Sequence, residues 1–120
     1  MTYKEVYDVL STIPMNETDS IPCAYLQFPE DDPSNPAPPP PFITYLYTGD
    51  DDLKADNINY QKIRSLAVEL YCDHKDFALE KTVETALTAH GFVYTKTEAY
   101  IKSEKLYETR YETEVIITNG

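Results

Sequence analysis

Alternation of side-chain character between Leu66 and Cys72 constrains the fold of this 120-residue chain more than any other feature of its sequence. Successive side chains of a β-strand point to opposite faces of the sheet, so the apolar set is expected on one buried face. That set is Leu66, Val68, Leu70 and Cys72. We therefore predict a central strand that begins near Tyr60 and ends at Cys72.

A helix is predicted immediately after this strand, over about residues 75–90. One stripe of this helix, at the spacing of a single helical face, holds Leu79, Val83, Ala86, Leu87 and His90. His90 is expected in the last turn, where a histidine interacts favourably with the helix dipole. Asp73 and Asp76 fit the first turn, where a carboxylate accepts hydrogen bonds from free backbone amides. Gly91 follows as the left-handed residue that commonly ends helices.

The joint between this strand and this helix places Cys72, Asp73 and His74 next to one another in sequence. A thiol nucleophile with a neighbouring base is one interpretation of such a string. Adjacent strand residues point to opposite faces, however, so Cys72 is expected to turn inward with Leu70 while His74 lies in the turn. Because a buried cysteine behaves as a small apolar residue, we interpret the joint as a capped turn and not as a catalytic site.

The first half of the chain contains one further helix and two short strands. Residues 3–13 are predicted to form a helix, because one helical face holds the apolar or aromatic residues Tyr3, Val6, Tyr7, Leu10 and Ile13. Thr2 is expected to cap this helix and Pro14 to end it. Residues 23–28 and 42–47 are short β-rich runs bounded by prolines or turn residues, and each is predicted to be a strand.

The C-terminal part, residues 92–118, alternates again and is predicted to form two strands of an antiparallel sheet. One face is charged, and the opposite face is expected to pack on the core through Tyr107, Tyr111, Val115 and Ile117. The element order is then one helix, three strands, a second helix and two strands. It predicts an α+β fold, a mainly antiparallel β-sheet with two helices packed on one face.

Composition and charge fit a single acidic domain over residues 1–120. Hydrophobic residues make up 42% and charged residues 26% of the chain, which is ordinary for a globular protein. The net charge of -11 argues against specific binding to nucleic acid or to anionic membranes, although charge can also serve solubility alone. No apolar run approaches the roughly 20 residues that a membrane helix needs.

The sequence contains none of the common motifs of enzymes or metal sites. Cys23 and Cys72 form no CxxC pair, which favours synthesis in a reducing cytoplasm. With three glycines and no GxGxxG or P-loop, a phosphate-cradling loop is not expected, and GxSxG and HExxH are absent as well. We therefore predict that the protein is not an enzyme, uses no cofactor and binds no metal.

Two connections are candidates for contact with other molecules. Residues 29–41 hold seven of the nine prolines and favour an extended polyproline arm, with a long solvated loop as the alternative. Residues 48–57 contain Asp50, Asp51 and Asp52. Calcium loops need oxygen ligands at alternating positions, so three consecutive acids are expected to be solvated.

Several strings in the stretch from Phe42 to Ile117 resemble the tail terminator, or tail completion, proteins of long-tailed bacteriophages. The sharpest are "ADNINYQK", "VELYCDHKDFALEKTVETAL" and "GFVYTKTEAYIKSEKLYETRYETEVI". In that family a strand ending in Leu-Tyr is followed by Lys-Asp, an acidic amphipathic helix, a Gly turn and a Tyr-rich terminal strand. The matching positions are Leu70, Tyr71, Lys75, Asp76, Glu80 and Tyr111.

The resemblance implies a structural protein at the tail-head junction of a virion, assembled in the host cytoplasm. Such proteins form a ring, commonly a hexamer, at the head-proximal end of the tail tube. They stop tube polymerisation and offer a surface to the head connector or stopper protein. The expected partners are therefore the tail tube protein, the head connector and further copies of this chain, and the free protein can be a monomer before it assembles.

The resemblance also suggests residues for two kinds of contact. A proline arm would reach a neighbouring subunit or the tube, through Pro36, Pro38, Pro39, Pro40 and Pro41. An acidic lumen would let DNA pass without binding, because like charge removes the counterion-release contribution to affinity. The candidates for this lining are Asp50, Asp51 and Asp52.

Other functions remain open at the level of sequence. Another neck component, such as an adaptor or stopper, is the nearest alternative. An acidic DNA mimic that inhibits a DNA-binding enzyme is a second, and a small hydrolase that uses some of the many carboxylates is a third. A deep pocket with a strongly perturbed acid would favour the hydrolase, and a salt-sensitive complex with a nuclease or polymerase would favour the mimic.

Overall fold

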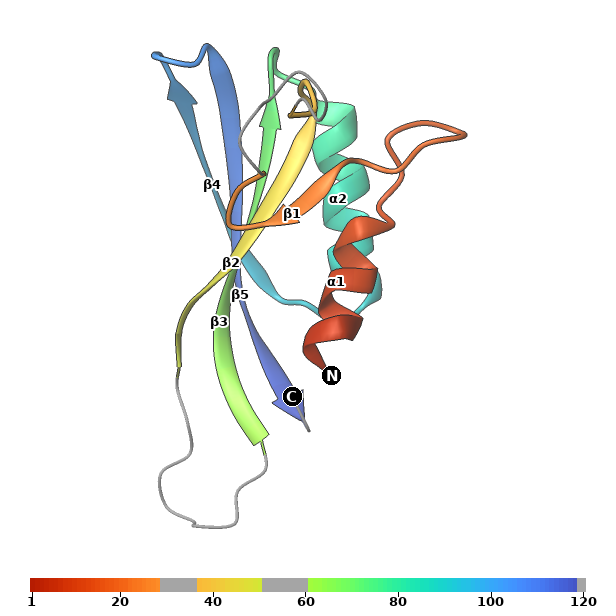
Figure 1. Ribbon diagram of the computed structural model, residues 1–120, viewed down its shortest axis with the longest axis vertical. Coiled ribbons are helices and arrows are strands. Elements are labelled where there is room, and N and C mark those ends of the chain that lie inside the picture. The colour runs from red at the N-terminus through yellow and green to blue at the C-terminus, as the bar shows by residue number, and fades with distance from the viewer. Residues whose placement is uncertain (29–36, 51–60, 119–120) are drawn as a thin grey trace.

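The computed structural model describes residues 1–28, 37–50 and 61–118, and within these the side chains of Asp50 and Gln61 are left out. Two helices lie on one face of a five-stranded sheet (Figure 1), which confirms the predicted α+β fold. Along the chain, the elements are α1 (Tyr3–Ser11), β1 (Cys23–Tyr25), β2 (Phe42–Asp50), β3 (Gln61–Cys72), α2 (Phe77–Ala89), β4 (Tyr94–Ile101) and β5 (Leu106–Thr118).

The strands lie in the order β1-β2-β3-β5-β4, so β3 occupies the central position that its alternation predicts. β1 is parallel to β2, and every other pairing is antiparallel. In this register Val68 of β3 faces Tyr45 of β2 on one side and Tyr111 of β5 on the other. All three residues are buried and lie on the face that the helices cover.

The core is a single cluster between this face of the sheet and the two helices. α1 contributes Val6 and Leu10, and α2 contributes Leu79, Val83 and Leu87. The sheet supplies Ile43, Tyr45, Leu66, Val68, Leu70, Cys72, Tyr111, Val115 and Ile117. The apolar sets predicted for β3 and for most of β5 are therefore confirmed as core residues.

Both helices begin at side-chain caps. At α1 the Thr2 hydroxyl accepts a hydrogen bond from the Glu5 amide while the Glu5 carboxylate accepts one from the Thr2 amide, which forms a capping box. At α2 the Asp76 carboxylate accepts from the Leu79 amide at 3.0 Å. Asp73, also predicted as a cap, instead contacts the His74 ring.

The ends of several elements differ from the prediction. β2 continues to Asp50, beyond the strand predicted over residues 42–47, so residues 48–50 belong to a strand and not to the predicted connection. α1 ends at Ser11, and Ile13 is buried in the core although it lies outside the helix. β1 ends at Tyr25 instead of residue 28 because Leu26 adopts a left-handed backbone, with φ of 68°, that a strand cannot accommodate.

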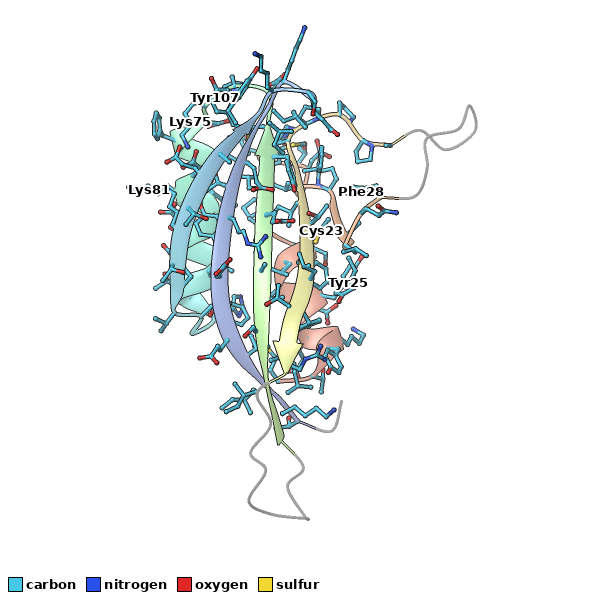
Figure 2. The ribbon with its side chains drawn as sticks, turned by 90° about the vertical axis from the view of Figure 1, so that its left-hand side faces the viewer. Cys23, Tyr25, Phe28, Lys75, Lys81 and Tyr107 are labelled. Carbon is cyan, nitrogen blue, oxygen red and sulfur yellow. The ribbon has the colours of Figure 1, made fainter. Side chains whose placement is uncertain are left out.

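Further differences concern α2 and two exposed tyrosines. α2 begins at Phe77, later than predicted, and Gly91 follows its end with φ of 83°, as predicted. Tyr7 is exposed and not on the buried stripe of α1. Tyr107 was expected in the core, yet it is 36% exposed, because it lies at the end of the sheet opposite Cys72, the last residue of β3 (Figure 2).

Neither described helix has the length and apolar character required to span a membrane.

Candidate functional site

The joint between β3 and α2 has the geometry of a turn. Burial raises the pKa of the Cys72 thiol to about 11, so this thiol is protonated at neutral pH. The Nδ1 atom of His74 lies 2.7 Å from Asp73, and this hydrogen bond raises the pKa of the exposed imidazole. Cys72 is therefore a core residue, while His74 interacts with acids of the turn and the helix cap.

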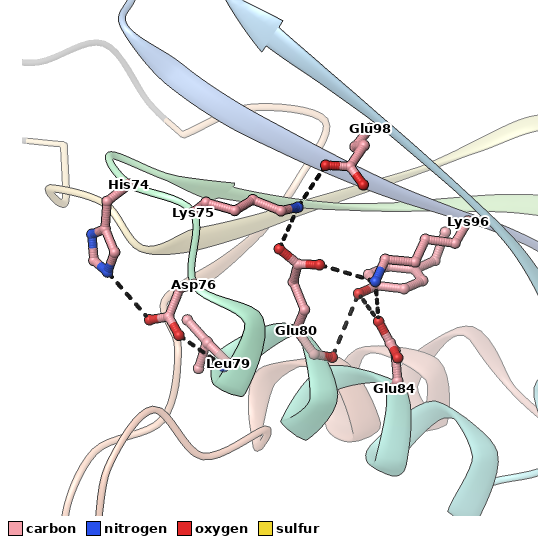
Figure 3. Close-up of polar contacts among 9 residues, drawn as sticks. His74, Lys75, Asp76, Leu79, Glu80, Glu84, Lys96 and Glu98 are labelled. Carbon is pink, nitrogen blue, oxygen red and sulfur yellow. Dashed lines mark hydrogen bonds and ion pairs between the residues drawn. The ribbon is translucent and has the colours of Figure 1, made fainter.

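Five charged side chains form ion pairs between α2, the turn before it and β4, and we call them the lysine–glutamate network (Figure 3). Its members are Lys75, Glu80, Glu84, Lys96 and Glu98. The Lys75 ammonium lies 2.6 Å from Glu80 and 2.7 Å from Glu98. The Lys96 ammonium lies 2.9 Å from Glu80 and 2.7 Å from Glu84. Glu80 is thus shared by two lysines that come from different parts of the chain.

Glu80 is the most buried member of the lysine–glutamate network, with its side chain only 4% exposed. Burial by itself raises the pKa of this carboxyl, but the hydrogen bonds and charges of Lys75 and Lys96 outweigh burial and leave the pKa lowered. The hydrogen bonds to Glu84 and Glu80 raise the pKa of Lys96 in spite of its partial burial. Glu80 and Lys96 therefore carry their charges at neutral pH.

Tyr111 connects the lysine–glutamate network to the core. Its hydroxyl donates to Glu84 at 2.8 Å, and its ring is fully buried. Burial, followed by the hydrogen bond to Glu84, raises the pKa of this phenol. The three carboxylates and two ammonium groups of the network leave one excess negative charge (3 − 2 = 1). Such an internally paired set is suited to holding α2 against the sheet.

The sequence signal for this network is weak. Glu80 and Glu84 are one helical turn apart, which places both on one side of α2. Lys96 faces Tyr111 in the β4–β5 register, and this pairing brings its ammonium under the helix. The register of a hairpin cannot be derived from charge spacing alone. The sequence resemblance therefore singled out Lys75, Glu80 and Tyr111, but it predicted neither the contacts among them nor the roles of Glu84, Lys96 and Glu98.

A second polar cluster lies on the opposite face of the sheet, which neither helix covers, and we call it the open-face cluster. Its members are Thr44, Glu69, Tyr71, Glu108 and Arg110. Glu69 accepts hydrogen bonds from Thr44 at 3.2 Å and from Arg110 at 3.0 Å. The Tyr71 hydroxyl lies 2.8 Å from Glu108 and 3.3 Å from Glu69. These contacts satisfy the carboxylate of Glu69 although the whole residue is only 8% exposed.

An apolar cavity of about 360 Å³ adjoins the open-face cluster. Among the residues that line it are Leu26, Phe28, Pro38, Phe42, Ile101 and Leu106. Pro38, Pro40 and Pro41 are half-buried and Pro39 is exposed, so the described end of the predicted proline arm lies against the body of the protein. Pro36 lies outside the described residues.

The acidic run predicted to line a lumen is described only in part. Asp50 is the last residue of β2, while Asp51 and Asp52 lie outside the described residues. Within residues 1–28, 37–50 and 61–118, the structure contains no group of three His, Cys, Asp or Glu side chains that could hold a metal ion.

The two ends of the sheet differ in chemistry. At the β1 end, Tyr3, Tyr25, Tyr45 and Tyr47 pack with ring centroids 5.1 to 6.3 Å apart, and we call them the tyrosine cluster. The Arg64 guanidinium lies 4.9 Å from the centre of the Tyr47 ring. Tyr25 remains half exposed (Figure 2). The eleven tyrosines of the chain are a sequence signal for aromatic packing, but neither this cluster nor its contact with Arg64 is predicted from them.

At the other end, β4 is the edge strand of the described sheet, and it pairs with β5. Its six interior residues, 95–100, are all exposed. The strand contains threonine and charged residues, and its outer backbone faces away from β5. At one end Tyr25 is therefore the exposed member of a largely buried tyrosine cluster, and at the other end the sheet presents a polar strand edge.

No protein-family model matches this sequence, and no curated protein matches it.

Proposed function

We propose that the protein is a structural component of a phage virion that forms a ring at the head-proximal end of the tail tube, terminates tube polymerisation and joins the tail to the head. The tail tube protein, the head connector or stopper and further copies of this chain are its proposed partners. The proposal rests on the resemblance of its strands and second helix to tail terminator proteins.

The observation that best supports a ring is the difference between the two ends of the sheet. A closed ring requires two different, complementary surfaces on each subunit, because every contact is head-to-tail. The β1 end, where Tyr25 is the exposed member of the tyrosine cluster, and the polar outer edge of β4 would supply two such surfaces. Tyrosine is enriched in protein interfaces, where its ring packs while its hydroxyl forms hydrogen bonds.

The charge of the chain also agrees with a protein that surrounds DNA without binding it. The net charge of -11 opposes attraction to phosphates. The two polar clusters of the described residues are internally paired by hydrogen bonds and ion pairs. We therefore propose an assembly role without catalysis.

Tube polymerisation provides the test. The purified protein is added to polymerising tail tube subunits encoded with it, and tube lengths and capped ends are counted by negative-stain electron microscopy. Tubes of restricted length with extra density at one end are expected. Unchanged lengths and bare ends with folded protein would contradict termination, and binding to the head connector alone would then favour an adaptor or stopper.

A pair of variants links this assay to the tyrosine cluster. Tyr25→Ser removes a half-exposed ring from the cluster and is expected to reduce the fraction of capped ends. Ile116→Ser changes a similarly exposed residue on β5 and is the control. Equal capping by both variants would exclude the tyrosine cluster as a ring contact.

A further inference from the structure

The outer edge of β4 is a backbone surface to which another strand can add. β4 spans eight residues, whereas β1 at the other end of the sheet spans three. Exposed edges offer rows of unpaired amide and carbonyl groups, and proteins commonly cover or pair them. Pairing with a further strand would satisfy these groups.

The sequence of β4 is self-complementary about Thr97 in an antiparallel arrangement. With Thr97 opposite Thr97 of a second copy, Lys96 lies opposite Glu98 of that copy, and Glu98 lies opposite its Lys96. In the same register Tyr94 lies opposite Tyr100, and Thr95 opposite Ala99. Opposite charges and aromatic pairs at directly facing positions stabilise a strand pair.

Other registers are less favourable. A slip of two residues in one direction would place Lys96 opposite Lys96, and a slip in the other direction would place Glu98 opposite Glu98. Like charges directly opposite each other destabilise a strand pair. A slip of one residue would turn the second copy over, so that its helices lay on the other face of the sheet. The charges of β4 therefore select one two-fold register.

The two charged residues of β4 can reach a second copy while keeping their present contacts. Side chains of Lys96 and Glu98 are 35% and 58% exposed, although both belong to the lysine–glutamate network. An ion pair between Lys96 and Glu98 of the second copy would join the two networks. Glu98 would then lie between Lys75 of its own chain and Lys96 of the other.

In this register, α2 of the second copy would lie on the same side of the sheet as α2 of the first. The outer surface of α2 has a shallow depression lined by Lys81, Glu84, Thr85, Thr88 and Ala89. Figure 2 places Lys81 at the outer side of α2, next to the β4 end of the sheet. The short side chains of Thr85, Thr88 and Ala89 permit close approach of a second helix, and Lys81 and Glu84 carry opposite charges.

We propose that the free protein forms a two-fold symmetric dimer in which β4 pairs antiparallel with β4 of a second copy, joining two five-stranded sheets into one. This contact closes at two copies and does not by itself build a ring. It covers the β4 edge, so the two copies must separate before that edge can join any other assembly. The inference is argued from β4 and α2 alone and does not rest on the proposed role in the tail, although the proposed ring uses the same edge of β4.

Cysteine cross-linking tests the register. Thr97→Cys places two thiols at directly opposite positions, where the Cα atoms of paired strands are about 4.5–5.5 Å apart and a disulfide can form. Thr95→Cys is the matched control, because both threonines are exposed on β4 and Thr95 lies opposite Ala99. The two thiols introduced by Thr95→Cys would be about 14 Å apart, a separation of four residues along the strand, which is too far for a disulfide.

After mild oxidation, the amount of disulfide-linked dimer is measured on a non-reducing gel. The wild-type protein shows how much cross-linking the native Cys23 and Cys72 produce by themselves. Thr97→Cys is expected to cross-link at least about tenfold faster than Thr95→Cys, because disulfide formation requires the short distance. Equal rates for the two variants would overturn the proposed pairing, even if the protein is a dimer.

Sedimentation velocity provides a second measurement without new thiols. The wild-type protein is expected to sediment as a dimer at micromolar concentration. Thr97→Lys places two ammonium groups opposite each other and is expected to raise the dimer dissociation constant at least about tenfold, while Thr95→Lys has a smaller effect. A wild-type protein that remains a monomer at the highest concentration, or equal effects of the two lysines, would overturn the proposal.

Discussion

Glu80 and Glu69 are both buried, but they lie on opposite sides of the sheet and are held in different ways. Glu80 is bound by two lysines, one from the turn before α2 and one from β4. Glu69 is bound by Thr44 and Arg110, which lie on the two strands that already pair with its own strand. Glu80 therefore joins α2 to β4, which is not a strand neighbour of the helix, whereas Glu69 adds to an existing strand ladder.

The difference indicates what each cluster contributes. Loss of Glu80 would leave two partly buried ammonium groups facing each other under α2. Loss of Glu69 would leave Arg110, which retains an ion pair with the exposed Glu112. We therefore expect the lysine–glutamate network to stabilise the docking of α2 and the open-face cluster to have a smaller effect on stability.

The largest effect is expected from Glu80→Ala. Removing one member of a buried ionic set leaves uncompensated charge, so we expect the free energy of unfolding to fall by about 3 kcal/mol. This value is at the low end for buried ion pairs, because both lysines retain some exposure to solvent. Urea denaturation monitored by circular dichroism measures it. Lys81→Ala, an exposed change on the same helix, is the control and should alter stability by less than about 0.5 kcal/mol.

Glu69→Ala tests the other half of the comparison. We expect the free energy of unfolding to fall by about 1–2 kcal/mol. The Thr44 hydroxyl and the Arg110 guanidinium each lose a hydrogen-bond acceptor that water can only partly replace. Glu114→Ala on the same face of β5 is the control, because Glu114 is exposed. A loss as large as that of Glu80→Ala would remove the proposed distinction between the two clusters.

The cap of α2 supplies a sharper comparison between neighbouring acids. Asp76→Ala removes the hydrogen bond to the Leu79 amide and should cost about 1 kcal/mol of unfolding free energy. Asp73→Ala removes only an exposed contact with His74 and is expected to be nearly neutral. If the two variants are equally destabilised, Asp76 is not the effective cap.

The smallest effect is a difference in acid sensitivity. Because the folded-state pKa of Glu80 is lowered from the usual 4.5, its contribution is present above pH 4.5 and is lost as the pH falls through the folded-state value. The stability difference between wild type and Glu80→Gln should therefore shrink below pH 4.5. Burial offsets part of the stabilisation by the lysines, so the change is small. Denaturation midpoints between pH 7 and 3 measure it, and a difference that is constant over this range would contradict the charge assignment.

The sequence predicts the sheet and helices well where periodicity is strong, and poorly where backbone geometry decides. Alternation in β3 and the apolar stripe of α2 identify core residues such as Leu70 and Val83, because burial of one face imposes the period. The end of β1 depends on the left-handed backbone of Leu26, which no local residue preference indicates. The exposure of Tyr107 depends on where the sheet ends, which follows from strand register.

The candidate site is less predictable than the fold for the same reason. Asp76 has a recognisable capping position, and Cys72 is inward by alternation alone. The ion pairs of Glu80 require the register of the β4–β5 hairpin and the position of α2 above it. Polar contacts between distant segments are consequences of tertiary packing and cannot be derived from spacing along the chain.

Electron cryo-microscopy of tail tubes grown with this protein tests the central proposal most directly. Averaged images of tube ends are expected to show a ring at one end only, into which copies of the α+β domain fit, with their sheet ends in contact between neighbours. Ends without such a ring, on tubes grown with an excess of folded protein, would contradict the proposed role in tail termination.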